Sequence, residues 1–323
     1  MLSINPLRQE ELTLNKTAKH MAIAAALVLT TNLWTSPSLA AAPTLPSSAP
    51  ASVTPLHTVQ LIDLPSGEVT VYDYGTIKLH AYATKDALND EAYILEGKTN
   101  LVAIEMPSFT KDLESWKDYA ASLNKPLNDV FIADHPAGAS YVKGMTIYGT
   151  QGAKDAITSG VTFAITDGLY KSFGSDFHGG SDMIHINRVV PAGDLVVGGI
   201  QFRIIDRGYT YDLEIPAIHA IYTHMLGKTT HSILTSTAHM DAMTAILKEY
   251  QQAGYALILS AHSVPEGQDA VAEKIAYIQK AKELTGQCRT AAEFIAAMKE
   301  QFPMYDGENY LEMTAANLYP SAQ

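Results

Sequence analysis

The chain has 323 residues, of which 47% are hydrophobic and 17% are charged, and its formal net charge at pH 7 is −12. This composition is typical of a globular protein with a sizeable core and excludes an intrinsically disordered chain. The acidic balance argues against a nucleic-acid partner, because little positive charge is available to neutralise phosphates. Cys288 is the only cysteine, which excludes an internal disulfide and a metal site built on several cysteines.

The first 41 residues carry the features of a secretory signal peptide. Lys16 and Lys19 precede a short apolar run at residues 21–30, and a Ser-Leu-Ala sequence follows it. The run is too short for a comfortable transmembrane span, so an uncleaved membrane anchor is the weaker alternative. We therefore expect cleavage near Ala40 or Ala42, a periplasmic or secreted location, and no stable membrane insertion after cleavage.

Residues 42–56 are rich in Ala, Pro and Ser, and we expect them to form a loose linker before one folded domain at residues 57–323. The domain begins with apolar runs that are separated by turn residues, which predicts β-strands. These strands cover residues 59–64, 69–74, 77–83, 92–96 and 100–105, and the last two form a hairpin. A helix with Thr110 as its N-cap follows and extends to about Leu123.

A short buried strand from Val130 to Ala133 leads straight into a loop that begins with His135 and ends near Ser140. The apolar residues of this strand do not alternate with polar ones, as is typical of a strand covered on both faces. In open α/β sheets, sites are built on the loops that leave the carboxyl ends of strands. His135 is therefore the first candidate functional residue.

The rest of the chain predicts a second β-rich block surrounded by helices. The predicted elements are a strand at 146–148, helices at 151–159 and 161–173, a polar loop at 175–182, strands at 184–190, 194–197, 200–206, 212–215 and 217–223, a helix at 240–250, a strand at 255–260, and helices at 268–284 and 290–301. Thr290 and Glu293 have the spacing of a capping box. Two β-rich halves, each ending in a helix–strand–helix unit, predict an α/β fold with two packed sheets and helices outside both, which is a four-layer αββα sandwich.

At this point the order of elements and three local patterns resemble the metallo-β-lactamase superfamily over roughly residues 75–285. The first pattern is the hairpin that begins at Asn89-Asp-Glu-Ala-Tyr-Ile-Leu, with the helix and the His135 loop that follow it. The second is Ile204-Ile-Asp-Arg-Gly-Tyr-Thr210 followed by Ala220-Ile-Tyr-Thr-His224. The third is the strand Ala256-Leu-Ile-Leu-Ser-Ala-His262.

The resemblance implies a hydrolase with one or two zinc or iron ions, held by a His-x-His-x-Asp-His loop, two further histidines and a bridging aspartate. His135 matches the first position of that loop, whereas Ala137, Ala139 and Ser140 stand at its other three ligand positions. In an alternative register, Asp134-His135 would be the end of the loop, and no upstream histidines would remain.

The other expected ligand positions are also only partly filled. Tyr209 stands where the next histidine is expected, His224 stands at the position of the bridging aspartate, and His262 keeps the final histidine. Zinc catalysis needs about three protein ligands and an open position for water. The resemblance therefore implies at most a reduced centre with His135, His224 and His262 as ligands, and it leaves Tyr209 as a candidate oxyanion donor.

Two interpretations follow from this partial ligand set. In the first, the protein is an exported hydrolase of an ester, lactone, amide or similar bond, with one zinc or iron ion held by the three histidines. In the second, the histidines are hydrogen-bonded around a cleft without a metal, and the protein is a non-catalytic binding protein for a small molecule or an exported partner. The fold alone does not choose between them.

Overall fold

The computed structural model describes residues 56–320. The expected signal peptide at residues 1–41 and nearly all of the expected linker at residues 42–56 lie outside this range. Within residues 56–320, no helix is both long enough and apolar enough to cross a membrane.

The first sheet has eight strands in the order β1-β2-β3-β4-β5-β6-β7-β8. Neighbours from β1 to β5 run antiparallel, and neighbours from β5 to β8 run parallel. Its strands are β1 (Thr58–Asp63), β2 (Glu68–Asp73), β3 (Lys78–Ala83), β4 (Glu91–Glu96), β5 (Leu101–Ile104), β6 (Leu127–Phe131), β7 (Thr146–Gly149) and β8 (Arg188–Val189).

The second sheet has six strands in the order β14-β13-β12-β11-β10-β9. All neighbours are antiparallel except β12 and β13, which run parallel. Its strands are β9 (Gly193–Val197), β10 (Ile200–Asp206), β11 (Tyr211–Ile215), β12 (Ala220–Thr223), β13 (Leu257–Ser260) and β14 (Ser263–Glu266).

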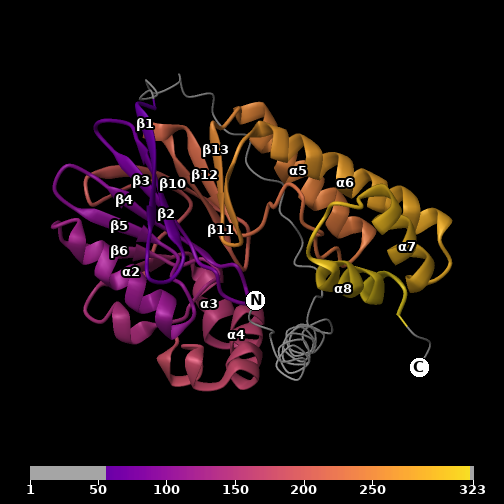
Figure 1. Cartoon of the computed structure of the whole chain (residues 1–323), viewed down its shortest axis with the longest axis horizontal. Coiled ribbons are helices and arrows are strands. Elements are labelled where there is room, and N and C mark those ends of the chain that lie inside the picture. The colour runs from indigo at the N-terminus through magenta and orange to yellow at the C-terminus, as the bar shows by residue number, and fades with distance from the viewer. Residues whose placement is uncertain (1–55, 321–323) are drawn as a thin grey trace, which may run out of the picture.

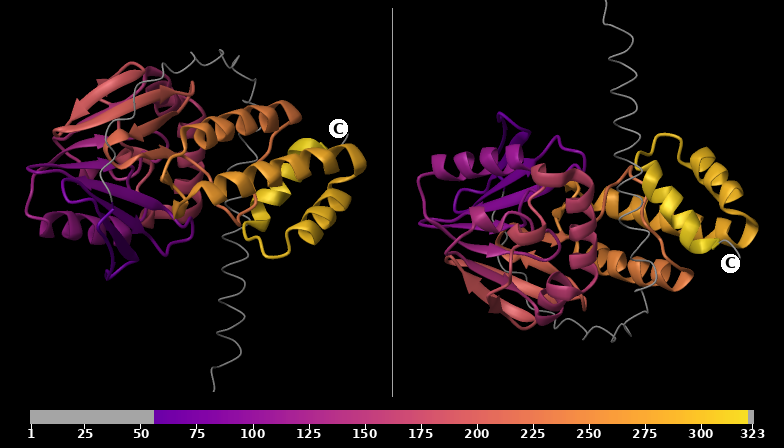
Figure 2. Two further views of the ribbon diagram at one scale, coloured as in Figure 1. Left: turned by 90° about the horizontal axis from the view of Figure 1, so that it is seen from above. Right: turned by 90° about the horizontal axis from the view of Figure 1, so that it is seen from below.

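The two sheets pack face to face and helices cover both outer faces (Figures 1 and 2). Aromatic rings meet between the sheets, since the ring centroids of Phe131 and Phe202 lie 4.9 Å apart. On the other face of the second sheet, Ile221 and Ile258 pack with Leu247 of α5 in a separate apolar core. The helices are α2 (Thr110–Ser122), α3 (Gln151–Ser159) and α4 (Val161–Phe173) in the first half, and α5 (Thr237–Ala253), α6 (Gln268–Gln287), α7 (Ala291–Gln301) and α8 (Glu308–Leu318) in the second. The predicted four-layer αββα sandwich is confirmed.

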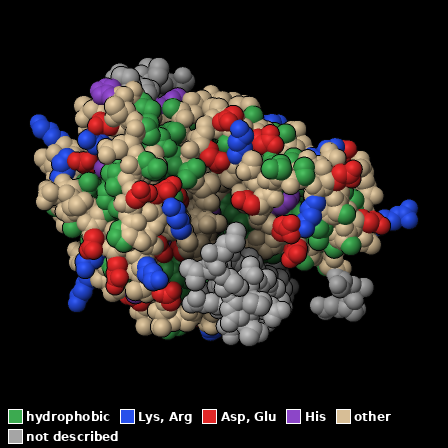
Figure 3. Space-filling view, viewed as in Figure 1, with side chains coloured by type: hydrophobic (Ala, Val, Ile, Leu, Met, Phe, Trp, Pro, Cys, Tyr) green, Lys and Arg blue, Asp and Glu red, His purple; other side chains and the backbone are tan. Residues whose placement is uncertain are grey.

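The surface of this sandwich is mixed in character. Figure 3 shows acidic and basic side chains interspersed over one face, with apolar side chains exposed among them. Val59 and Leu61 of the outer strand β1 are 55% and 59% exposed. The buried apolar groups instead lie between the sheets and beneath the helices.

Several predicted boundaries are wrong, each for a tertiary reason. The strand predicted at Val130–Ala133 is β6 at Leu127–Phe131, because the backbone N–H of Ala133 turns away to bond Glu105. Of the strand predicted at residues 184–190, only β8 forms, because the N–H of Ile184 bonds the loop carbonyl of Pro136. The prediction did not include β14 or α8.

The two predicted helix N-caps differ in what determines them: one follows from the local sequence, and the other is replaced by a long-range contact. Thr290 caps α7 as predicted by accepting a hydrogen bond from the backbone N–H of Glu293. The predicted N-cap Thr110 is instead the first residue of α2, after Phe109, and Phe109 provides no side-chain cap. The Thr110 hydroxyl lies 3.0 Å from His178 Nε2, so a long-range contact replaces the local cap.

Glu91 in β4 provides a test of how this core responds to pH. Its side chain is 2% exposed, and burial, with a contribution from Glu68, raises its pKa from 4.5 to about 8. The folded protein therefore keeps a proton that the unfolded chain releases, so this residue lowers stability as pH rises between those two values. We expect Glu91→Gln to stabilise the protein at pH 8. The difference in free energy of unfolding between the variant and the parent should grow by about 1.4 kcal/mol per pH unit between pH 4.5 and about pH 8.

The measurement is urea unfolding of both proteins at pH 5 and pH 8. Glu312→Gln, at an exposed position of α8, is the matched control and should show no pH-dependent difference. A difference between Glu91→Gln and the parent that is the same at both pH values would contradict the assignment.

Candidate metal centre

The loop that carries His135 is held by the carboxylate of one buried residue, Glu105, which directly follows β5. Glu105 Oε1 accepts hydrogen bonds from the backbone N–H groups of Ala133 at 2.8 Å and Asp134 at 3.0 Å, and Oε2 accepts one from His135 at 2.9 Å. The hydroxyl of Tyr222, from β12 in the other sheet, donates to Oε1 at 2.9 Å. Glu105 therefore fixes the backbone of the loop and links the two sheets.

This arrangement has a conformational and an electrostatic cost. Glu105 has φ of 58°, in the left-handed region that few non-glycine residues adopt. Burial, then the charge of Asp134, raises the pKa of Glu105 to about 7, against the lowering effect of the three backbone hydrogen bonds. A buried acid in a strained backbone conformation persists only where surrounding contacts stabilise it. Here those contacts are the hydrogen bonds that hold the His135 loop.

Three histidines from three strand ends converge beside this loop. His135 follows β6 by a few residues, His224 directly follows β12, and His262 comes two residues after β13. His135 Nε2 and His262 Nε2 lie 3.1 Å apart, and one ring nitrogen from each of the three residues lies within 4.8 Å of the others. Within residues 56–320 this is the only group of three or more His, Cys, Asp or Glu side chains with ligand atoms in such reach.

Carboxylates lie on the opposite side of these rings. Asp90 Oδ1 is 3.8 Å from His135 Nδ1 and 3.6 Å from His262 Nδ1, and Asp134 Oδ1 is 3.8 Å from His224 Nδ1. The separations from the carboxylates are too long for hydrogen bonds, and the Leu88 carbonyl instead accepts a hydrogen bond from His262 Nδ1 at 3.2 Å. Metal-binding histidines are commonly oriented by a carboxylate or a backbone carbonyl at the second ring nitrogen.

The donor chemistry fits a metal ion. Burial, together with the neighbouring histidines, holds the pKa of His135 well below its ordinary value and lowers that of His262 to about 3. Both rings are therefore neutral at pH 7, with nitrogen lone pairs available for coordination. Two nitrogens that share a tetrahedral zinc at about 2.0–2.1 Å lie about 3.3 Å apart, close to the separation of His135 and His262.

Asp90 adds a second observation on how the site would accommodate a cation. Its side chain is fully buried; neither carboxylate oxygen meets hydrogen-bond geometry among the described residues, although the nearby Ser108 hydroxyl lowers its pKa. Burial, followed by the charge of Asp86, raises the pKa of Asp90 well above its ordinary value. A buried acid of this kind is costly unless it is paired, and a cation bound at the nearby imidazoles would compensate it.

Comparison with known proteins was informative only at the level of structure. No family model and no curated protein matches this chain in sequence. A metallo-beta-lactamase family protein from Thermus thermophilus superposes with a TM-score of 0.52 at 13% identity, covering 75% of this chain and 91% of the other. The chain has the metallo-β-lactamase fold.

Two further structures share this fold. A double mutant of the sec-alkyl sulfatase PisA1 gives a TM-score of 0.52 at 14% identity over 76% of this chain, and the stereoselective inverting sec-alkylsulfatase Pisa1 from Pseudomonas sp. gives 0.50 at 16% identity over 75%. The match covers 50% and 49% of those chains, so this protein spans about half the length of the sulfatases it matches. At these identities the likeness concerns the fold alone.

Residues 137–140, where the resemblance places three further ligand positions, carry no imidazole or carboxylate and are held by hydrogen bonds. Ala137 is buried and pairs with Met183, and the N–H of Gly138 donates to the carbonyl of His178 at 3.1 Å. The hydroxyl and N–H of Ser140 both donate to Asp182, at 2.9 and 2.8 Å. The second half of the loop is thus fastened to the segment around residues 177–184, and the histidine site is built from its first half.

Tyr209 lies in the turn between β10 and β11, near Asp134. It is 37% exposed, and partial burial, then the charge of Asp134, raises its pKa to about 12. The phenol therefore keeps its proton at neutral pH and can act as a hydrogen-bond donor. Its role as an oxyanion donor stays a prediction.

The sequence analysis missed the two buried acids that organise the site. Glu105 follows a strand whose residues are all apolar and buried, and Asp90 precedes a strand that is almost wholly buried. A carboxylate at such a position needs buried partners, and this was the available signal. What no local pattern could provide was the identity of those partners, since His135 and His262 are far from Asp90 along the chain.

The Glu105 carboxylate can be tested by an isosteric change. Glu105→Gln replaces one acceptor oxygen by an NH₂ group, which leaves either the N–H of His135 or the donors at Oε1 without an acceptor. We expect a loss of about 2–4 kcal/mol in stability, as for a buried charged hydrogen-bond network. Chemical denaturation measures it, and Glu300→Gln at an exposed position of α7 is the control. Equal stability of the two variants would show that Glu105 does not hold the loop.

Proposed function

We propose that this protein is an exported hydrolase of small molecules that uses one zinc or iron ion held by His135, His224 and His262. The observation that carries the proposal is the convergence of three ring nitrogens within 4.8 Å, from strand ends of both sheets. Three imidazoles are a suitable ligand set for a catalytic zinc ion, which needs about three protein ligands and an open position for water. The substrate would be an ester, lactone or amide.

Each side chain of the site has a part in this proposal. An ion held by the histidines would supply Lewis-acid activation of a water molecule and of the scissile carbonyl. Asp90 and Asp134 would orient the rings from behind, and Glu105 would keep the backbone of His135 in place. Tyr209, protonated at neutral pH, would donate a hydrogen bond to the oxygen that gains negative charge.

His224 is the most accessible of the three ligands. Its side chain is 36% exposed, compared with 11% for His135 and 18% for His262. A reacting group would therefore approach from the side of His224, while His135 and His262 form the more buried part of the site.

The second candidate is a non-catalytic binding protein that uses the same cleft for a small molecule or an exported partner. It is favoured by the fastening of Ser140 to Asp182, because this contact stabilises the loop without any metal. Metal content separates the two candidates directly.

We expect protein purified without chelator to carry about one equivalent of zinc or iron, measured by elemental analysis, because the site offers three imidazole ligands. His262→Ala removes one of these ligands and should leave less than about a tenth of an equivalent. His185→Ala, at an exposed histidine, is the matched control and should retain the parent content. Parent protein with less than about a tenth of an equivalent, unchanged after zinc or iron addition, would favour the binding protein.

Asp90 gives a second prediction that leaves all three ligands in place. Asp90→Asn keeps the shape of the side chain but removes the charge behind His135 and His262. We expect metal affinity to fall by about 10–100-fold, as is typical when a carboxylate partner of a metal-binding histidine is lost. Competition with a chromophoric chelator measures the affinity. Asp63→Asn, at an exposed position of β1, should match the parent, and an unchanged affinity for Asp90→Asn would remove Asp90 from the site.

A further inference from the structure

A pocket opens beside His262 and is bounded in part by the C-terminal helix α8. We call it the C-terminal pocket. It is lined by residues of the β3–β4 loop (87–89), the segment after β12 (225–231), the β13–β14 turn (260–263) and the start of α8 (306–310), and its volume is about 200 Å³. This is room for about six water molecules. A group of a few carbon atoms would fit it.

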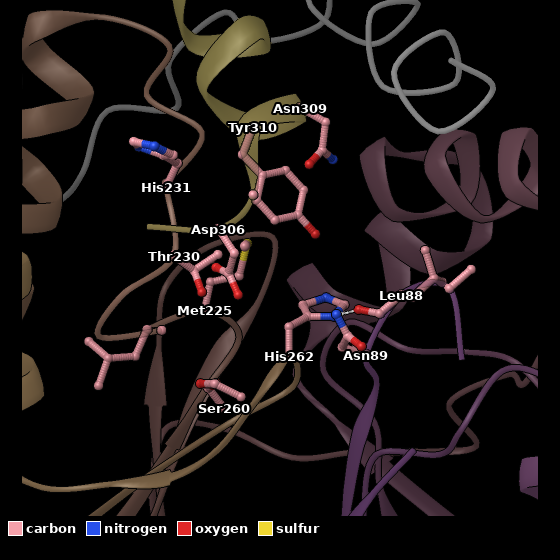
Figure 4. A pocket seen from close by; sticks show the side chains of 15 residues that line it. Leu88, Asn89, Met225, Thr230, His231, Ser260, His262, Asp306, Asn309 and Tyr310 are labelled. Atoms are coloured by element: carbon pink, nitrogen blue, oxygen red, sulfur yellow. Dashed lines mark hydrogen bonds between the residues drawn. The ribbon is translucent and has the colours of Figure 1, made fainter. Parts of the chain in front are cut away.

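The wall nearest the candidate metal centre presents polar side chains. In Figure 4 the hydroxyl of Tyr310, which comes from α8, points toward Leu88, Asn89 and His262. Asn89 adopts φ of 52°, a left-handed conformation that asparagine tolerates better than most residues. The phenol of Tyr310 and the amide of Asn89 are therefore presented together beside His262, where they can hydrogen-bond a polar but neutral group.

The described residues that line this pocket include no lysine or arginine. Asp306 is the only Asp, Glu, Lys or Arg among them, and it is exposed. His231 also lines the pocket, but burial, followed by the charge of Lys274, lowers its pKa to about 4. Its ring is therefore neutral at pH 7.

Two lysines beside the lining segment at residues 225–231 are already paired with other groups. Lys274 is buried and donates to the carbonyl of Thr230 at 2.6 Å, and Lys228 pairs with Asp269 at 2.6 Å. Glu266 lies behind the same wall and accepts the backbone N–H groups of Gly227 and Lys228 at 3.0 and 2.6 Å. An anionic group in the pocket would therefore meet acidic neighbours and no free cation among the described lining residues, in a protein whose net charge is −12.

We propose that the C-terminal pocket holds the acyl group of the substrate and selects uncharged acyl compounds against anionic ones, with Tyr310 and Asp306 as specificity-determining residues. This inference rests on the proposed hydrolase function, since it places the acyl group next to His262. It also separates this protein from enzymes that accept sulfate esters, because a sulfate ester would bring a negative charge to a pocket whose one charged lining residue is Asp306.

Two p-nitrophenyl esters that differ only at the end of the acyl chain, a methyl group in one and a carboxylate in the other, provide the test, with each rate measured above spontaneous hydrolysis. p-Nitrophenyl butyrate and p-nitrophenyl hemisuccinate have acyl chains of the same length, but only the second carries a carboxylate. We expect kcat/KM to be at least about tenfold higher for the butyrate at low salt, the size of effect that one close like charge produces at a protein surface. Asp306→Lys should raise hemisuccinate hydrolysis about tenfold relative to butyrate. Glu300→Lys makes the same change in net charge at an exposed position of α7 and should leave the ratio unchanged.

Tyr310→Phe tests the hydrogen bond separately from charge. It should raise KM for the butyrate several-fold without changing metal content. Tyr319→Phe is the control, because that tyrosine follows the same helix but bonds the carbonyl of Thr285 at 3.3 Å, away from the pocket.

Binding of ketones that cannot be hydrolysed distinguishes this inference from the proposed function. Saturation-transfer NMR with 2-pentanone and with levulinate should show binding of the neutral ketone and weaker binding of the anionic one. If neither ester is hydrolysed but the neutral ketone binds selectively, the pocket assignment stands and the hydrolase proposal fails. Hydrolysis of both esters at equal rates, equal or tighter binding of levulinate, or no binding of either ketone would overturn the inference.

Discussion

The buried carboxylate of Glu105 is the contact on which the candidate site depends. It gathers three consecutive backbone N–H groups of the His135 loop from one sheet and the hydroxyl of Tyr222 from the other. A buried acid is tolerable only when its acceptor sites are filled, so the loop cannot relax without leaving that acid unsatisfied. The position of His135 is therefore set by the same contact that joins the two sheets at this end of the molecule.

The other two histidines are placed by strand pairing. β12 and β13 are parallel neighbours in which Thr223 pairs with Ser260, so the residues that follow each strand emerge at the same edge. The backbone continues this pairing for one step, since the N–H of Ala261 donates to the carbonyl of His224 at 2.9 Å. His224 and His262 thus lie side by side as a consequence of register, and β6 in the facing sheet brings His135 to them.

Sequence patterns predicted the layers because strands and turns are encoded locally, and the resemblance to the metallo-β-lactamase superfamily singled out the three histidines. Apolar runs and turn residues mark the strands, and each histidine closely follows such a run. The acids behind the rings are not encoded in this way. Asp90 reaches His262 from a distant part of the sequence, and Tyr310 reaches the same pocket from α8, a helix that the sequence analysis did not include. Such contacts follow from the packing of the two sheets and the C-terminal helices, which no window of sequence contains.

Residues 137–140 carry no imidazole or carboxylate, and protein contacts hold this part of the loop. His178 bonds Asp182 at 2.7 Å and Thr110 at 3.0 Å, and Asp182 in turn accepts both donors of Ser140. These hydrogen bonds to α2 and to the segment around residue 180 hold the second half of the loop, and Glu105 holds the first half with His135 in position. Both halves of the loop are therefore fixed by protein contacts, which leaves the three imidazoles as the group that could hold an ion.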